Sequence, residues 1–177
     1  MNVQHSSKSF RWFTPIPLVE AAREVLGTID LDPASEPEAN EIILATRIIT
    51  EAENALNPNT PWRLEGETAR KGILNPPGGK VKNKSRAALF WQRTLDEYYK
   101  GNIESLIFFS FSLNLLRTSQ QCTEWVLDFP TCIFRSRIAY RDPEGKSDSP
   151  PADSMAILVG KGTLKFNEVF SNFGRVH

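Results

Sequence analysis

Residues 72–111 read GILNPPGGKVKNKSRAALFWQRTLDEYYKGNIESLIFFSF, and this stretch decides the fold class. A short apolar strand at 72–74 stops at two prolines, which supply no N–H for a sheet. After a polar turn, the spacing of apolar residues predicts a helix over 85–100. Gly101 and Asn102 end that helix, and 103–111 is apolar enough for a strand buried on both faces. Strand, helix and strand in this order predict a crossover between parallel strands.

The same alternation extends in both directions from this stretch. Before it, the pattern predicts a helix at 17–26, a strand at 28–31, a helix at 36–46 and a strand at 47–50. After it come a helix at 113–121, strands at 131–140 and 155–159 around a polar loop, and a short helix or turn at 166–173. We therefore expect an α/β fold with a mainly parallel sheet, helices on both faces and an antiparallel edge. Residues 1–9 are a polar tail, and 10–177 form one domain.

The composition excludes several kinds of chemistry. The 177 residues include only two histidines, of which His5 lies in the polar tail and His177 is the last residue. This argues against histidine-dependent nucleophiles and histidine-rich metal sites, so we expect no metal. Cys122 and Cys132 cannot build a disulfide framework, which suggests a reduced, cytoplasmic protein. No run of about 18 apolar residues occurs, so we expect no membrane segment.

Charge is balanced overall, with 21 basic and 21 acidic residues, but it is unevenly distributed. Residues 20–54 hold nine acidic side chains against two basic ones, whereas 61–100 hold nine basic against four acidic. The basic residues are densest at Lys80, Lys82, Lys84 and Arg86. A cluster of this kind predicts contact with a polyanion such as DNA. The alternative is a solvated loop without a partner.

Two motifs fall at predicted strand ends, where ligands bind in open α/β sheets. They are Asp-Pro-Ala-Ser at 32–35 and Asn-Pro-Pro-Gly at 75–78. The two prolines stiffen the second turn, and the proline after Asn75 keeps that residue extended, so its side chain should face outward. The Asn75 side-chain oxygen and the Pro76 carbonyl would then form two adjacent acceptors, which suits an amino group with two N–H bonds. The alternative is an ordinary proline-rich strand exit.

The ordered set of motifs resembles the phage-type (Dam-like) DNA N-6-adenine methyltransferase family over nearly all of 10–177. The motifs that carry the resemblance are Trp-Phe-Thr-Pro at 12–15, residues 25–35, and Leu-Asn-Pro-Pro-Gly at 74–78. The resemblance implies a Rossmann-like sheet and S-adenosylmethionine as cofactor. It also implies transfer of a methyl group to the amino group of adenine in DNA. A protein encoded by a phage or prophage, acting in the bacterial cytoplasm, is implied as well.

Carried over residue by residue, the resemblance assigns roles to both motifs. The catalytic turn would be Asn75, Pro76, Pro77 and Gly78, with Asn75 also beside the cofactor. The cofactor would lie against Trp12, Thr14, Pro15, Asp32, Pro33 and Ala34, with its ribose held by Glu51 or Glu53. The basic residues after Gly79 would hold DNA phosphates while a nucleotide is flipped out of the duplex.

This chain departs from the family pattern at Gly78, where many members carry an aromatic residue that stacks on the base. Phe10, Trp12 and Trp62 are the candidates to replace it. The departure keeps open a second hypothesis, a degenerate protein that binds DNA or a host protein without methylating it. An RNA base, a protein glutamine or the cytosine amino group are alternative substrates. No length remains for a separate recognition domain, so we expect a short target sequence or help from a second copy in a homodimer.

Overall fold

The computed structural model of the chain describes residues 12–141, 147–148 and 153–177. The predicted tail at 1–9 and most of the polar loop between the two late strands lie outside these residues.

Within the described residues, seven strands form one sheet in the order β11-β7-β10-β6-β3-β1-β2. Strands β2, β1, β3 and β6 are parallel, whereas β10 is antiparallel to β6 and β7, and β11 is antiparallel to β7. The predicted α/β class with a mostly parallel sheet is therefore confirmed. The strands are β1 (Leu31–Asp32), β2 (Arg47–Ile48), β3 (Arg70–Leu74), β6 (Ile103–Ser110), β7 (Thr131–Phe134), β10 (Met155–Gly160) and β11 (Gly174–Val176).

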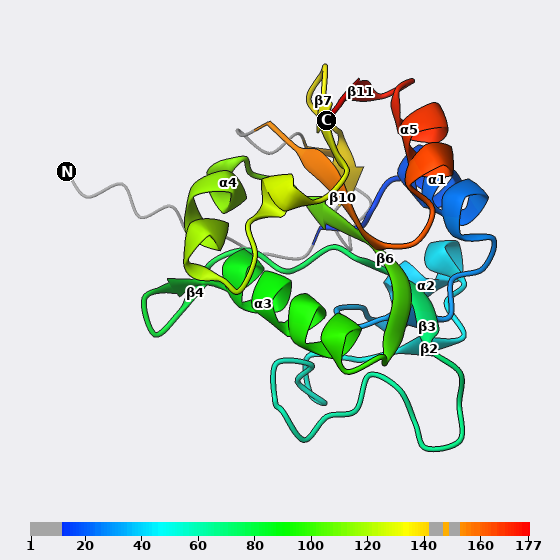
Figure 1. Cartoon of the computed structure of the whole chain (residues 1–177), viewed down its shortest axis with the longest axis vertical. Coiled ribbons are helices and arrows are strands. Elements are labelled where there is room, and N and C mark those ends of the chain that lie inside the picture. Colours follow the sequence, from blue (N-terminus) through cyan, green and yellow to red (C-terminus); the bar gives the residue numbers. More distant parts are fainter. Residues whose placement is uncertain (1–11, 142–146, 149–152) are drawn as a thin grey trace.

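Helices cover both faces of the sheet, as predicted (Figure 1). Helices α1 (Ile16–Leu26), α2 (Pro37–Ile43) and α5 (Thr163–Phe170) pack on one face. Helices α3 (Arg86–Tyr99) and α4 (Asn114–Thr118) pack on the other, followed by the 3-10 turns η1 (Ser119–Gln121) and η2 (Val126–Asp128). Because side chains alternate along a strand, Ile107 packs beneath α1 and α5 while Phe108 packs beneath α3.

Helix boundaries follow local chemistry. Helix α1 ends at Gly27, whose φ of 79° suits glycine and whose N–H donates to the Arg23 carbonyl at 2.8 Å. Helix α3 begins after Ser85, whose hydroxyl accepts from the Ala88 N–H. The predicted helix at 36–46 is wrong at its C-terminus, because Leu44 adopts a left-handed φ of 53° directly after Ile43.

The predicted antiparallel edge is confirmed, since β10, β7 and β11 lie together at one side of the sheet with β11 outermost. Two further expectations need correction. The predicted strand at 131–140 ends at Phe134, and β8 (Tyr140–Arg141) pairs separately with β9 (Ser147–Asp148). The predicted basic loop is a hairpin of β4 (Lys80–Val81) and β5 (Lys84–Ser85), turned by two residues with positive φ.

Candidate functional site

The order of strands reverses between β1 and β3. The chain runs from β1 to β2 on one side and then returns to place β3 on the other side of β1. At such a point the connections leave in opposite directions and open a crevice beyond the carboxyl ends of the strands. Gly72 allows the close approach, because a Cβ at this position would lie 2.6 Å from the Leu31 carbonyl oxygen.

A cleft of about 1040 Å³ opens in the crevice between these strand ends. It is walled by the segment before α1, the ends of β1, β2 and β3, the β4–β5 hairpin and the start of α3. This volume matches the size of natural small-molecule sites. The cleft brings together most of the residues that the sequence singled out: Trp12, Thr14, Asp32, Pro33, Ala34, Glu51, Asn75, Pro76, Pro77 and Arg86.

Five of the predicted site residues do not line this cleft. Pro15 instead caps the N-terminus of α1. Gly78 follows the two prolines and is half-buried outside the wall. The other three are Lys80, Lys82 and Lys84, which are exposed on the hairpin.

Asn75 is held by a bond from a distant part of the chain. Its Nδ2 donates to the Trp12 carbonyl at 2.7 Å, across 63 residues of sequence. Its Oδ1 is shielded from solvent and has no hydrogen-bond partner among the described residues. A buried acceptor without a donor costs about 1–3 kcal/mol, which makes this oxygen a candidate acceptor for a ligand in the cleft. The Asn75 side chain is thus half-buried and fixed, rather than simply facing outward as predicted.

Asp32 places a carboxylate under the same cleft. The residue is 2% exposed, and its Oδ1 accepts from the Ala34 N–H at 3.1 Å. Burial raises the pKa of Asp32 from 3.8 to about 7, and the hydrogen bond from Ala34 offsets only part of that rise. A carboxyl with this pKa is stabilised in its charged form by any cation that enters the cleft.

The two acidic residues after β2 have different surroundings. Glu53 accepts from the Thr50 N–H and from the Thr50 hydroxyl, both at 2.8 Å, and these bonds lower its pKa. Glu51 lines the cleft, with its Oε1 3.9 Å from the Arg86 guanidinium. Glu53 therefore caps its own turn, whereas Glu51 presents its carboxylate to the cleft.

The structure separates the three aromatic candidates. Trp62 is fully buried, and its Nε1 donates to the Ala55 carbonyl at 3.1 Å, so its faces are closed to a ligand. Phe10 lies outside the described residues. Trp12 is half-buried and lines the cleft.

The β4–β5 hairpin projects from the body of the protein beside the N-terminus of α3 (Figure 1). Its three lysines are exposed, and Val81 between them forms part of the cleft wall. Positive charge therefore lies at the mouth of the cleft, next to its apolar wall. Sequence reasoning missed Val81 because it lies within a basic run, and missed Phe90 because the α3 pattern marks it as core.

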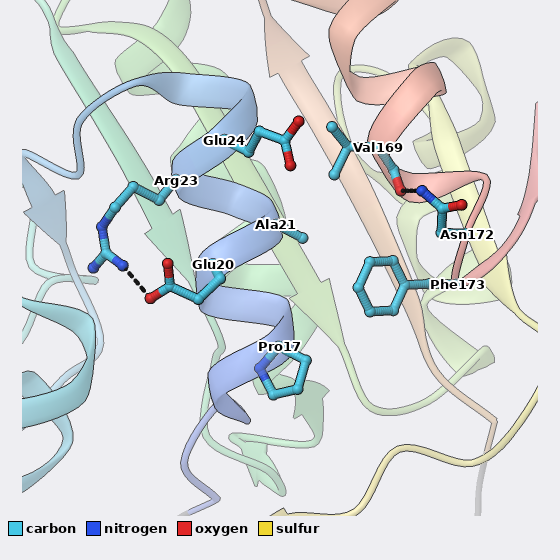
Figure 2. A pocket seen from close by; sticks show the side chains of 8 residues that line it. All are labelled: Pro17, Glu20, Ala21, Arg23, Glu24, Val169, Asn172 and Phe173. Carbon is cyan, nitrogen blue, oxygen red and sulfur yellow. Dashed lines mark hydrogen bonds and ion pairs between the residues drawn. The ribbon is translucent and has the colours of Figure 1, made fainter.

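A second hollow of about 510 Å³ lies between α1 and the C-terminal end of α5. Figure 2 shows Glu20 paired with Arg23 on α1, and Asn172 donating to the Val169 carbonyl. Glu24 pairs with Lys165 at 2.8 Å. The charged groups of this α1–α5 groove are thus paired with neighbouring residues.

In the part of the chain that the structure describes, no group of histidine, cysteine, aspartate or glutamate side chains is arranged to hold a metal ion. No helix in that part is long and apolar enough to cross a membrane. Comparison of the chain with protein-family models and with curated proteins finds no match.

Proposed function

We propose that this protein uses S-adenosylmethionine to methylate the exocyclic amino group of adenine in DNA, on a Rossmann-like sheet. One observation carries the proposal. At the crevice where the strand order reverses, the Asn75 amide is fixed through its nitrogen and keeps an unpartnered oxygen. An amino group is the donor that this oxygen lacks. The resemblance in the motifs at 12–15, 32–35 and 75–78 supports the same assignment.

The cleft fits the cofactor in charge and in size. The methionine end of S-adenosylmethionine carries an ammonium, a carboxylate and a sulfonium, and the buried Asp32 carboxylate is stabilised by a nearby cation such as the ammonium. Glu51 lines the cleft, where its carboxylate can accept from ribose hydroxyls. Ile49 and Ala34 supply apolar wall for a flat ring. When bound, the cofactor supplies a methyl group that is electrophilic because it is attached to a sulfonium.

The Asn-Pro-Pro turn holds the amine that receives the methyl group. Asn75 Oδ1 accepts one amine hydrogen, and the Pro76 carbonyl accepts the other. Binding both hydrogens draws the nitrogen away from conjugation with the ring and frees its lone pair. The contribution of these residues is alignment, which supplies up to about 7–11 kcal/mol in well-oriented reactions.

The β4–β5 hairpin provides the contact with DNA. Lys80, Lys82 and Lys84 are exposed beside the mouth of the cleft, where they pair with phosphates on either side of an extruded nucleotide. The acidic groups Asp32 and Glu51 lie within the cleft. A cationic cofactor and an anionic polymer therefore meet opposite charges at neighbouring positions.

The test is mass spectrometry of nucleosides from DNA incubated with the protein and S-adenosylmethionine. We expect N6-methyladenine with the native chain and about 10²–10³-fold slower methylation with Asn75→Ala. N4-methylcytosine in place of N6-methyladenine would show that the target base is cytosine rather than adenine. The proposal that an exocyclic amino group is methylated would then still hold. A protein that binds the cofactor but methylates no DNA would overturn the enzyme assignment in favour of a non-catalytic binder.

A further inference from the structure

We propose that Trp12 forms one wall of the pocket for the target base: its indole supplies the stacking face, and its carbonyl fixes the Asn75 amide. This inference rests on the proposed function, because it concerns the base that presents the amine. It begins from the bond between Asn75 Nδ2 and the Trp12 carbonyl, which places residue 12 directly beside the unpartnered Oδ1.

The segment that carries Trp12 is anchored on its C-terminal side. Thr14 is only 3% exposed. The Pro15 carbonyl accepts from the first turn of α1, from Leu18 N–H at 3.0 Å and Val19 N–H at 3.1 Å. The backbone at residue 12 is therefore held from the helix on one side and from Asn75 on the other. This fixed position is what a binding wall requires.

A base taken out of a duplex loses its stacking partners, and an aromatic face restores about 1–3 kcal/mol per base. Gly78, beside the predicted catalytic prolines, has no side chain to provide that face. Three described aromatic residues line the cleft: Trp12, Phe13 and Phe90. Phe90 is 5% exposed within the core beneath α3, and Phe13 packs against the core beneath α1. Among the described residues, Trp12 belongs to neither core cluster, which favours its ring over those of Phe13 and Phe90 as the stacking face.

The same bond accounts for selection of an amino group. With Nδ2 committed to the Trp12 carbonyl, the amide cannot rotate without placing its oxygen against another acceptor. The atom beside the cleft is therefore fixed as an acceptor. A base with an exocyclic amine satisfies that acceptor, whereas a base with a carbonyl at the same position faces it oxygen to oxygen.

Two substitutions test the stacking wall in the full-length chain. Trp12→Phe keeps an aromatic face, and Trp12→Leu keeps apolar volume without one. We expect Trp12→Phe to stay within about 3-fold of native kcat/KM on DNA, and Trp12→Leu to lose about 5- to 150-fold. Both should keep the native Tm. Because the resemblance places Trp12 against the cofactor, the affinity for S-adenosylmethionine decides between the two roles, and the stacking wall requires that it stay native in both variants. Equal rates for the two variants, or a parallel loss of cofactor affinity, would overturn the inference.

Tryptophan fluorescence gives a readout that does not depend on turnover. Adenine-containing oligonucleotides should quench the native protein more than Trp12→Phe, since the difference reports the residue 12 indole. The matched control is Phe173→Leu in the α1–α5 groove, which should lower Tm and leave that quenching unchanged. Quenching without methylation would overturn the proposed reaction and keep the stacking wall. Methylation without a difference in quenching would overturn the stacking wall and leave the proposed reaction standing.

Discussion

The two hollows of this molecule differ in how their polar groups are satisfied. In the α1–α5 groove, Glu20 pairs with Arg23, Glu24 pairs with Lys165, and Asn172 donates to a carbonyl one turn away. In the strand-end cleft, Asn75 Oδ1 is shielded without a partner, and Asp32 is a buried carboxyl whose pKa burial raises to about 7. The groove gains little from a ligand, whereas the cleft has two groups that a ligand would stabilise.

Unmet hydrogen bonding and charge distinguish the strand-end cleft from the α1–α5 groove better than shape does. Both hollows are large enough for a small molecule. Of the two, only the cleft lies where the strand order reverses. Its Asn75 oxygen lacks a hydrogen-bond donor among the described residues, and the burial of its Asp32 carboxyl is only partly offset by hydrogen bonds. Substitutions in the two hollows should therefore have opposite effects on activity and on stability.

The largest contrast is expected between two asparagines. Asn75→Ala should lower kcat/KM for DNA methylation by about 10²–10³-fold, the usual cost of removing a group that holds the reacting atoms. Its Tm should change little, because loss of the hydrogen bond to the Trp12 carbonyl is offset by removal of an unsatisfied buried acceptor. Asn172→Ala should keep native kcat/KM and lose about 0.5–1.5 kcal/mol of stability with its hydrogen bond to Val169. Steady-state kinetics and thermal unfolding of both variants check this, and a reversed pattern would refute the comparison.

The next contrast concerns lysines. Replacing Lys80, Lys82 and Lys84 together with glutamine should weaken DNA binding by about 10²-fold near physiological salt. The slope of log affinity against log salt should become shallower by about 3. Lys161→Gln combined with Lys165→Gln, just before and within α5, is the matched control and should leave both quantities native. Fluorescence anisotropy of labelled duplexes measures them. Unchanged affinity in the triple variant would mean that the hairpin is not the DNA contact.

The smallest contrast is expected at Asp32. Its pKa is 3.8 ordinarily and about 7 in the folded chain, so between these values the folded state binds more protons than the unfolded state. Asp32 therefore destabilises the fold increasingly as pH rises from about 4 to 7. Asp32→Asn should raise Tm relative to the native protein at pH 8 but hardly at pH 4.

The same substitution should weaken S-adenosylmethionine binding by about 10-fold at pH 8, since the cation loses a charged partner. Native affinity should rise as pH passes upward through about 7, where the carboxyl ionises. Calorimetric titrations at several pH values measure this, with Glu24→Gln in the groove as the control. If the affinity of the native protein for S-adenosylmethionine does not change with pH, Asp32 does not contact the cofactor.

Much of the fold could be predicted because its signals are local. The apolar run at 103–111, the Gly27 stop after α1 and the Ser85 cap of α3 all act within a few residues. Pairing of β11 with β7 could not be predicted, because three residues after a helix carry no periodicity of their own. The position of β10 between β6 and β7 depends on tertiary pairing in the same way.

In the candidate site, too, local features could be predicted from the sequence and long-range contacts could not. The residues at strand ends, Asp32 and Asn75, could be identified because prolines mark where the strands stop. The bond from Asn75 to Trp12 could not, since it joins residues 63 positions apart. That Glu51 rather than Glu53 lines the cleft also needed coordinates, because the bonds from Thr50 to Glu53 are what distinguish two acidic residues two positions apart.

The place of β10 affects how the chain is assembled during synthesis. The strands that carry the cleft, β1, β2 and β3, form one half of the sheet with β6, and of the three only β3 pairs with β6 directly. Strand β10 fills the gap between β6 and β7 although it follows both in the chain. Until residues 155–160 leave the ribosome, β6 and β7 both present unpaired apolar edges, which invite association with other chains. A nascent chain stalled after β7 is thus the form most exposed to aggregation, and the arrival of β10 closes both edges at once.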